Sequence, residues 1–317
     1  MTSTSLSGPA LSLKRIAWKR EGIIFFTFLA VILAGSSATT SSARQAAANS
    51  VQDAWHAQAR FTLSALAFLS AGAAASPAAA AITLFDPSGD FDYQIGGSFT
   101  PVSSVTTVSR DNSDEPAEGL YNICYVNAFQ AQEEDSNWWL QNAPQLLLQE
   151  NGQPVKDPDW DEYIFNTTTD ANRQALAAIL EPTIQTCATK GFNAIEPDNL
   201  DTYTRFSELT KADNLAFARI LSDYAHSLGL AFAQKNTAGL KAADKTTGGF
   251  DFAIAEECQV YSECDEYSNL YGNYMIEIEY KSDGKKYFTA ACAARGAQIP
   301  INYRNLDVTP KGVDEHC

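Results

Sequence analysis

The chain has 317 residues, enough for one large domain with an appendage or for two small domains. Hydrophobic residues make up 45% of it, with 17 Phe and 13 Tyr, which excludes a disordered chain. Acidic residues outnumber basic ones by 38 to 22, and the formal net charge is -16. Such a surface repels polyphosphates, which argues against nucleic acid as a partner, whereas an acidic cleft attracts a cationic substrate.

The first 82 residues differ in composition from the rest. Basic residues at positions 14, 15, 19 and 20 precede an apolar run at 23–34, as in an export signal. That run is shorter than the roughly 20 residues of a membrane span, and a second apolar stretch at 61–81 resembles a further signal or a weak anchor. The sequence predicts a signal peptide or membrane anchor with a low-complexity leader over 1–82, and one catalytic domain over 83–317. The expected location is secreted or at the cell surface, with a single-pass anchor as the alternative.

Beyond residue 83, strand-like apolar runs alternate with helical patterns. Helices are expected at 170–190 and 213–228, ended by Gly191 and Gly229, and Pro182 is expected to kink or divide the first. Strands are expected at 91–95, 123–127, 163–165, 193–196, 230–234, 252–255, 275–280 and 299–303. These runs lack clean alternation, as expected of parallel strands covered by helices.

This order of elements favours an α/β fold, a single (β/α)8 domain of the TIM-barrel type. An open doubly wound sheet is the alternative. Such a sheet normally has a glycine-rich phosphate turn after a strand, and the sequence contains neither a G-x-G-x-x-G motif nor a P-loop.

The six cysteines are compatible with three disulfides in an exported protein. Cys258 and Cys264 are close enough to close a small loop, and the pairing of the other four stays open. The three histidines lack ligand spacing with the cysteines, so no metal or other cofactor is predicted. The sequon that begins at Asn166 agrees with a secreted glycoprotein.

Polar side chains close three successive predicted strands, in the blocks 196–199 (Glu-Pro-Asp-Asn), 234–236 (Gln-Lys-Asn) and 256–258 (Glu-Glu-Cys). In a barrel enzyme, catalytic groups lie at the carboxyl ends of the strands. Cleavage of a glycosidic bond needs two carboxyl groups, one to protonate the leaving oxygen and one to attack the sugar or activate water. The pattern therefore predicts a hydrolase with Asp198 and either Glu256 or Glu257 as the pair, although strand-end acids also cap helices or form surface ion pairs.

The predicted first strand carries Asp92 and Gln94 on either side of Tyr93. Alternation places Asp92 and Gln94 on the same side of the strand, where they either bind sugar at the barrel mouth or fix the strand end. Tyr125, Tyr261 and Tyr267 are candidates for stacking on sugar faces. Serine hydrolase chemistry is disfavoured, because there is no G-x-S-x-G motif and histidine is scarce.

Lys235 is expected to orient a carboxylate or lower its pKa, or else to form a simple salt bridge.

Together these motifs resemble glycoside hydrolase family 114. They occur in that family's order over roughly residues 90–280: Phe91-Asp92-Tyr93-Gln94, Cys124-Tyr125-Val126-Asn127, Gly191-Phe192-Asn193-Ala194-Ile195-Glu196-Pro197-Asp198-Asn199, Lys235-Asn236, and Ala255-Glu256-Glu257-Cys258 with Tyr261 and Cys264. The resemblance implies a barrel enzyme of the endo-α-1,4-polygalactosaminidase type, with Asp198 as nucleophile and Glu256 as general acid/base of a retaining reaction. The residues expected to bind the substrate are Asp92, Gln94, Tyr125, Glu196, Lys235, Asn236, Glu257, Tyr261 and Glu279.

The substrate implied is a galactosamine-containing polysaccharide of the galactosaminogalactan type. Its deacetylated amines are protonated in mildly acidic surroundings, and a strongly negative protein attracts such a polymer. We expect a monomer with this polysaccharide as its partner. Two other functions remain open at this point: a non-catalytic polysaccharide-binding barrel and a barrel α-galactosidase of different specificity.

Overall fold

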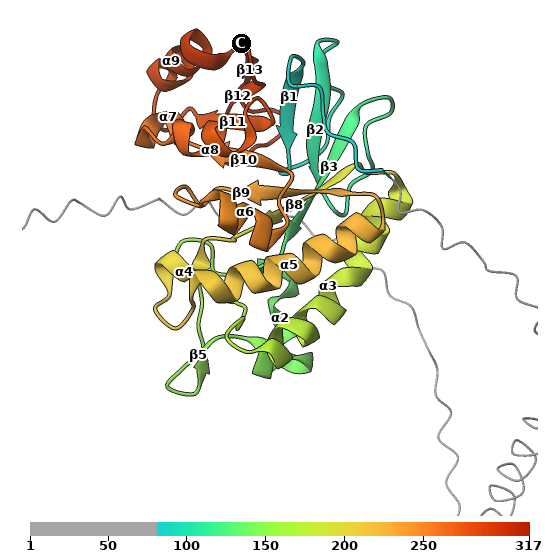
Figure 1. Ribbon diagram of the computed structural model, residues 1–317, viewed down its shortest axis with the longest axis vertical. Coiled ribbons are helices and arrows are strands. Elements are labelled where there is room, and N and C mark those ends of the chain that lie inside the picture. The colour runs from blue at the N-terminus through green and yellow to red at the C-terminus, as the bar shows by residue number, and fades with distance from the viewer. Residues whose placement is uncertain (1–80) are drawn as a thin grey trace, which may run out of the picture. The chain divides into compact units, whose positions relative to one another are not determined.

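The computed structural model describes residues 81–317, so residues 1–80 of the predicted leader lie outside the described residues. Eight parallel strands form a nearly closed barrel, and a ninth, antiparallel strand follows at its edge (Figure 1). The predicted TIM-barrel-like fold is confirmed. In sheet order the strands are β1 (Asp90–Gln94), β2 (Val105–Asp111), β3 (Tyr121–Asn127), β8 (Ala194–Asp198), β9 (Ala231–Lys235), β10 (Phe252–Glu256), β11 (Met275–Tyr280), β12 (Ile301–Arg304) and β13 (Asp314–His316).

Helices connect the parallel strands from β3 to β12, whereas loops 95–104 and 112–120 connect β1, β2 and β3. The connecting helices are α3 (Asp170–Lys190), α5 (Lys211–Ser227), α6 (Ala242–Gly248), α8 (Cys264–Tyr271) and α9 (Lys285–Arg295). The short helices α4 (Thr202–Arg205) and α7 (Cys258–Tyr261) follow the tips of β8 and β10. Every helix between residues 81 and 317 is too short or too polar to span a bilayer.

Residues 128–169 form a long excursion between β3 and α3. Two small antiparallel pairs hold it together: β4 (Gln130–Ala131) with β7 (Tyr163–Ile164), and β5 (Gln149–Glu150) with β6 (Gln153–Pro154). It also contains α2 (Ser136–Asn142) and the 3-10 turns Glu133–Asp135 and Pro144–Leu146. Since it begins at the carboxyl end of β3, it extends the barrel on the face where catalytic groups are expected.

Two predictions about these elements were wrong. The strand expected at 163–165 pairs with β4 in the excursion and is not part of the barrel. β2 takes its place among the eight barrel strands, and this strand was not predicted. Division of the helix at Pro182 was the second, since α3 is continuous; a kink at Pro182 stays a prediction. Pro182 and Ala178, whose carbonyl loses its helical partner, are both exposed, so water can satisfy that carbonyl.

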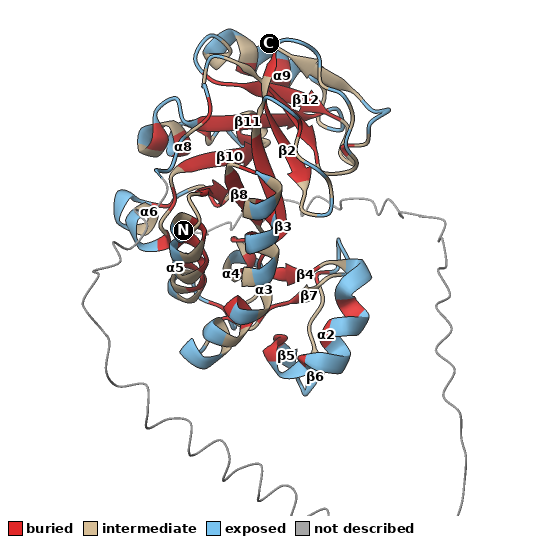
Figure 2. Cartoon of the chain, turned by 90° about the vertical axis from the view of Figure 1, so that its right-hand side faces the viewer, coloured by how far each residue is buried: buried red, intermediate tan, exposed pale blue. Residues whose placement is uncertain are grey.

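The barrel strands are almost entirely buried, and the helices bury only one face (Figure 2). Successive side chains of each strand point to opposite faces of the sheet, so each strand contributes to two apolar layers. One layer fills the barrel, as Ala194, Ala233 and Ile254 show, and the other lies between strands and helices, with Ile195 and Phe232. Two positions after each of these inward-facing residues, at 196, 235 and 256, the side chain is charged. The interior of the barrel therefore changes from apolar to ionic toward the carboxyl ends of the strands.

Side chains complete the barrel between its first and last parallel strands. The Asn302 amide oxygen accepts from the Tyr93 backbone N–H at 3.1 Å, and the Arg304 guanidinium donates to the Tyr93 carbonyl oxygen. His316 on β13 lies 2.7 Å from the Asp92 carboxylate. This seam, made by β1, β12 and β13, therefore replaces a backbone ladder with polar side chains.

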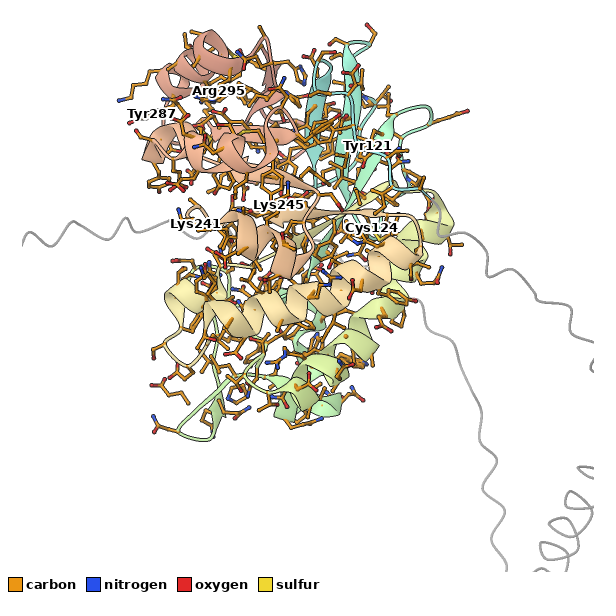
Figure 3. The ribbon with its side chains drawn as sticks, in the orientation of Figure 1. Tyr121, Cys124, Lys241, Lys245, Tyr287 and Arg295 are labelled. Carbon is orange, nitrogen blue, oxygen red and sulfur yellow. A yellow bond between two sulfur atoms is a disulfide. The ribbon has the colours of Figure 1, made fainter. Side chains whose placement is uncertain are left out.

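Charged side chains also connect helices to the sheet and to each other. Arg295 on α9 pairs at 2.8 Å with Glu277, which is fully buried on the outer face of β11. The Lys245 ammonium on α6 donates to the Leu270 carbonyl oxygen at 3.0 Å, and thereby ties α6 to α8. Arg295 and Lys245 are labelled in Figure 3.

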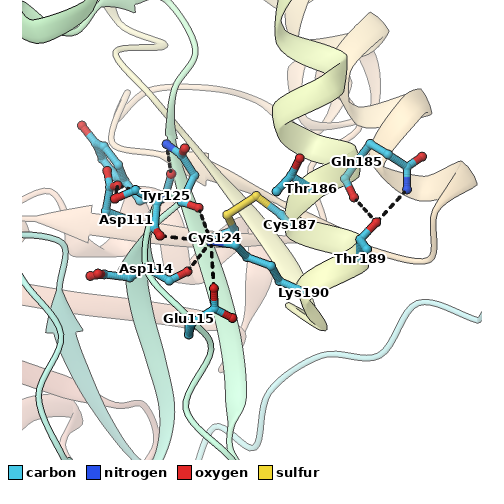
Figure 4. The surroundings of a disulfide bond; sticks show 12 residues. Asp111, Asp114, Glu115, Cys124, Tyr125, Gln185, Thr186, Cys187, Thr189 and Lys190 are labelled. Carbon is cyan, nitrogen blue, oxygen red and sulfur yellow. Dashed lines mark hydrogen bonds and ion pairs between the residues drawn. A yellow bond between two sulfur atoms is a disulfide. The ribbon is translucent and has the colours of Figure 1, made fainter. Parts of the chain in front are cut away.

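The six cysteines form three disulfides: Cys124–Cys187, Cys258–Cys264 and Cys292–Cys317. The predicted short loop between Cys258 and Cys264 is confirmed. Cys124–Cys187 joins β3 to α3, and Lys190 near the end of that helix donates to three backbone carbonyl oxygens of residues 112–114 (Figure 4). This disulfide therefore fixes α3 against the strand that carries Tyr125.

We expect loss of Cys124–Cys187 to be costly, because the bond closes a loop of 63 residues. Replacing both cysteines by Ala should lower the free energy of unfolding by about 4 kcal/mol, against about 2 kcal/mol for the bond across the six-residue separation of Cys258–Cys264. Urea unfolding of the two double variants measures this difference. A larger loss for the short loop would contradict the loop-entropy argument.

Candidate active site

Three acidic side chains surround one ammonium group at the carboxyl ends of β8, β9 and β10. The Lys235 Nζ lies 3.0 Å from a Glu196 oxygen, 3.2 Å from Asp198 Oδ1 and 3.1 Å from Glu256 Oε2. Asp198, Lys235 and Glu256 are the last residues of their strands, so strand register alone brings them to one edge. Lys235 and Glu196 are buried, whereas about a fifth of the Asp198 and Glu256 side chains is exposed. The pair predicted to be catalytic is thus accessible from solvent above a buried ion pair.

Phenol groups orient each of these carboxylates. The Tyr125 hydroxyl donates to Asp198 Oδ2 at 2.7 Å, and the Tyr280 hydroxyl donates to Glu256 Oε1. The Tyr93 hydroxyl donates to Glu196 at 2.8 Å and accepts from Lys235 at 3.0 Å. Each acid therefore has a fixed direction as well as a charge partner.

Asn236 fixes the Glu256 carboxylate from the neighbouring strand. Its amide nitrogen donates to Glu256 Oε2 at 2.9 Å, and its amide oxygen accepts from the Glu256 backbone N–H at 2.8 Å. Ser109 on β2 completes the support of Glu196 by donating from its hydroxyl.

The chain turns sharply directly after each of the three strand ends. Asn199, Asn236 and Glu257 follow Asp198, Lys235 and Glu256, and all three have left-handed backbones with φ of 66°, 47° and 58°. Asn adopts this conformation more readily than most residues, but Glu does so at a cost. Such strain is concentrated at functional sites, where the surrounding structure holds it in place.

The charges of the site are coupled. Burial alone would raise the pKa of Asp198, but the ammonium of Lys235 and the Tyr125 hydrogen bond outweigh it and lower that pKa. Burial likewise disfavours the ammonium, yet the carboxylates of Asp198, Glu256 and Glu196 raise the pKa of Lys235 well above its usual value. Asp198 is therefore a carboxylate and Lys235 a cation across the neutral range, as a nucleophile and its charge partner require.

The structure brings together six of the residues expected in the site and places three others apart. Asp198, Glu256, Glu196, Lys235, Asn236 and Tyr125 contact one another directly. Asp92, Gln94 and Glu279 are fully buried, with polar atoms bound to His316, Arg110 and the backbone N–H of Gln259. Sugar contact by these three stays a prediction without support from their positions.

The physical reason is strand alternation. Asp92 and Gln94 do share a side, since they are hydrogen bonded to each other at 3.1 Å, but the inward residue between them is Tyr93. On β11 the inward residues include Tyr280, which leaves Glu279 on the outer face. Tyr93, Tyr280 and Ser109 were not predicted as members of the site, and period-two counting from Phe91 and from Ile278 could have identified the two tyrosines.

Glu257 directly follows Glu256 and caps the start of α7, and Tyr261 is the last residue of that helix. Glu257 is partly exposed, and burial, together with Asp283 and Glu256, raises its pKa to about 8. Tyr261 is 56% exposed. Both are therefore free to contact a ligand.

Two groups of side chains between residues 81 and 317 have metal-ligand spacing. Cys258, Cys264 and Glu277 form one, but its two sulfur atoms are joined in a disulfide and offer no thiolate. Asp92, Asp314 and His316 form the other, and Arg304 already lies 3.6 Å from Asp314, which opposes a second cation. The disulfide disfavours a metal ion at the first group, and the guanidinium of Arg304 disfavours one at the second.

The carboxyl groups of Glu162, Glu257 and Glu279 predict a decline in stability with rising pH. Burial is the main cause that raises the pKa of each to about 8. Since their pKa in the unfolded chain is close to 4.5, the folded state holds these protons more tightly. The resulting stability is complete below about pH 4.5 and is lost as pH rises toward 8.

We expect the melting temperature to be roughly 5 °C or more lower at pH 8.5 than at pH 5. Calorimetry at constant ionic strength measures this. Glu279→Gln should reduce the slope most, because Glu279 is fully buried, whereas the exposed Glu150→Gln should leave it unchanged. An equal or higher melting temperature at pH 8.5 would contradict the assignment.

A TIM-like barrel with an accessible carboxylate pair at the carboxyl ends of its strands is the arrangement expected of a glycoside hydrolase. The model of glycoside hydrolase family GH114 matches residues 72–317, more than half of the chain, and the chain belongs to that family. The resemblance seen in the sequence motifs is thereby confirmed.

The fold of this chain is similar to that of several solved structures. Ega3 of Aspergillus fumigatus, in a crystal structure with galactosamine, is 20% identical with a TM-score of 0.60, over 74% of this chain and 98% of that one. The glycoside hydrolase domain of PelA from Pseudomonas aeruginosa is 14% identical with a TM-score of 0.49, over 72% and 98%. A comparison with curated proteins found no match.

Proposed function

We propose that the protein is an endo-acting glycosidase that cleaves α-1,4-linked, galactosamine-containing polysaccharide with retention of configuration. Asp198 attacks the anomeric carbon, and Glu256 protonates the leaving oxygen and then deprotonates the incoming water. The observation that carries this proposal is the binding of both carboxylates to one ammonium, that of Lys235, at the solvent-accessible end of the barrel.

The spacing of the two acids supports retention. The Asp198 and Glu256 oxygens that bind Lys235 lie 3.2 Å and 3.1 Å from its nitrogen, so they are at most the sum of these distances, 6.3 Å, apart. Retaining enzymes hold their carboxyl groups about 5–5.5 Å apart, and inverting enzymes leave about 6.5–9.5 Å for a water molecule. This limit applies to the two oxygens that contact the ammonium, and it is compatible with the carboxyl spacing of a retaining enzyme.

Charge supports an aminated substrate. Residues 1–80 carry six basic and two acidic residues, a net charge of +4, so the remaining residues carry -20 of the total of -16. A cationic polymer is drawn to such a surface and an acidic one is repelled. The galactosamine bound in the Ega3 crystals agrees with this substrate class. Secretion is supported by the export-like leader and the three disulfides.

Mass spectrometry of the products from α-1,4-linked galactosamine oligomers tests the proposal, together with the anomeric configuration of the first product by NMR. We expect internal cleavage and an α product. Binding without release of reducing ends would instead indicate a non-catalytic polysaccharide-binding barrel. Cleavage of aryl α-galactosides but not of the aminated oligomers would indicate an α-galactosidase.

A further inference from the structure

Glu162 is an acid beside the catalytic centre that has no cationic partner. It precedes β7 in the excursion, and its side chain is partly exposed. The Asn127 amide donates to Glu162 Oε2 at 2.8 Å, and Asn127 faces Asp198 in the register of β3 and β8. The amide of Asn199, the residue after Asp198, donates to the Asn127 amide oxygen at 3.0 Å. A single side chain, that of Asn127, therefore lies between Glu162 and β8, the strand that carries the proposed nucleophile.

Two acids close to Glu162 have cations of their own. Arg205 lies 3.5 Å from Asp157, and Lys156 lies 2.9 Å from Asp161. Among residues 81–317, no Lys, Arg or His lies within ion-pair distance of Glu162. Lys235 is the cation of the site, and its ammonium already binds three carboxylates. The carboxyl group of Glu162 thus has no cationic partner within this part of the protein.

The backbone around Glu162 is fixed. The Asp157 N–H donates to the Glu162 carbonyl oxygen at 2.8 Å, and the Asp161 N–H donates to the Asp157 carbonyl oxygen at 3.0 Å. The Gln130 amide also donates to the Asp157 carboxylate at 3.1 Å. A carboxylate held in place in this way binds a charged group without first losing conformational freedom.

We propose that Glu162 recognises the protonated amine of a galactosamine unit bound in the cleft next to Asp198. This inference rests on the proposed function and adds the residue that selects amine over acetamide. An ammonium group supplies the positive charge that Glu162 lacks and donates hydrogen bonds to its free oxygen, whereas an N-acetyl group is neutral.

The acid–base properties of Glu162 agree with this role. Burial is the main cause that raises its pKa to about 8, and the charges of Asp198 and Asp157 raise it further while Asn127 opposes them. An ammonium at contact distance favours the carboxylate and reverses this shift. The bound amine and Glu162 therefore stabilise each other's charged forms.

The test compares two oligomers, fully deacetylated and fully N-acetylated α-1,4-galactosamine, by calorimetric titration. Glu256→Gln serves as the background, so that neither oligomer is hydrolysed. We expect this parent to prefer the amine form, and Glu162→Gln to reduce the ratio of the two affinities about tenfold. Gln keeps an oxygen that accepts from Asn127, and Glu150→Gln, an exposed acid of the same excursion, is the matched control.

The outcomes separate the two proposals. If the parent prefers the amine and Glu162→Gln retains that preference, or if Glu150→Gln reduces it equally, the role of Glu162 is overturned and the proposed function stands. A parent that binds both oligomers but prefers the acetylated one also overturns the role of Glu162. Both proposals are overturned if the Glu256→Gln parent binds neither oligomer and the unmodified enzyme cleaves neither.

Discussion

Replacing Asp198 by Asn or Glu256 by Gln is expected to lower kcat by several powers of ten while the fold is retained. Both substitutions keep the size of the side chain and an oxygen that accepts from Tyr125 or Tyr280. They remove a nucleophile in one case and a proton donor in the other, groups that act in the transition state. Initial rates on aminated oligomers and circular dichroism of each variant provide the measurement.

The two variants should differ with an activated substrate. An aryl glycoside with a good leaving group needs no proton for departure, so Glu256→Gln should lose less of the first chemical step than Asp198→Asn. The matched control is Asp223→Asn, an acid on the exposed side of α5 that pairs with Arg219. Full activity in either site variant would eliminate the assignment of Asp198 and Glu256.

Lys235→Met is expected to have the largest effect on stability. It leaves three carboxylates within 3.2 Å of the missing ammonium, two of them partly exposed and one, Glu196, fully buried. Removing one partner of a buried ion pair costs about 3–5 kcal/mol, because the remaining charges lose their compensation. The pKa of Asp198 should rise as well, so the acidic limb of the pH–rate profile should move upward.

Urea unfolding and a pH–rate profile check both effects. Adding Glu196→Gln to Lys235→Met should restore part of the stability, since it removes the most deeply buried of the uncompensated charges. Lys241→Met is the control, because that ammonium is 71% exposed and its pair with Glu266 is worth less than about 1 kcal/mol. Equal stability of Lys235→Met and the natural protein would contradict the central role of Lys235.

Most of the barrel could be predicted because most of its strands are short apolar runs that end at or next to polar residues. The ends of β8, β9 and β10 were located closely enough to place Asp198, Lys235 and Glu256 at one edge. β2 was missed even though Val105, Thr106, Thr107 and Val108 are all β-branched, because the polar residues that follow obscured the apolar signal.

The candidate site was predictable only in part. The alternation of side chains along a strand shows which residues share a face of the sheet, but it does not show which face points into the barrel. Asp92 and Gln94 were expected either to bind sugar at the mouth or to fix the strand end; the barrel seam engages Asp92, and Tyr93 points to Glu196. Glu162 gave no signal at all, since its proximity to Asp198 depends on the path of the whole excursion. Contacts of that kind arise from tertiary structure and have no local pattern.

The seam has a consequence for how the molecule is made. Tyr93 and Asn302 are 209 residues apart in sequence, and Asp92 and His316 are 224 apart, so the cylinder can be completed only after almost the whole domain has been synthesised. Until then β1 exposes an open edge, and such edges associate readily with other chains. Contacts between such distant segments also form slowly. Joining the two margins of the sheet is therefore expected to be a late step, and the period before it is when the nascent domain most needs protection from aggregation.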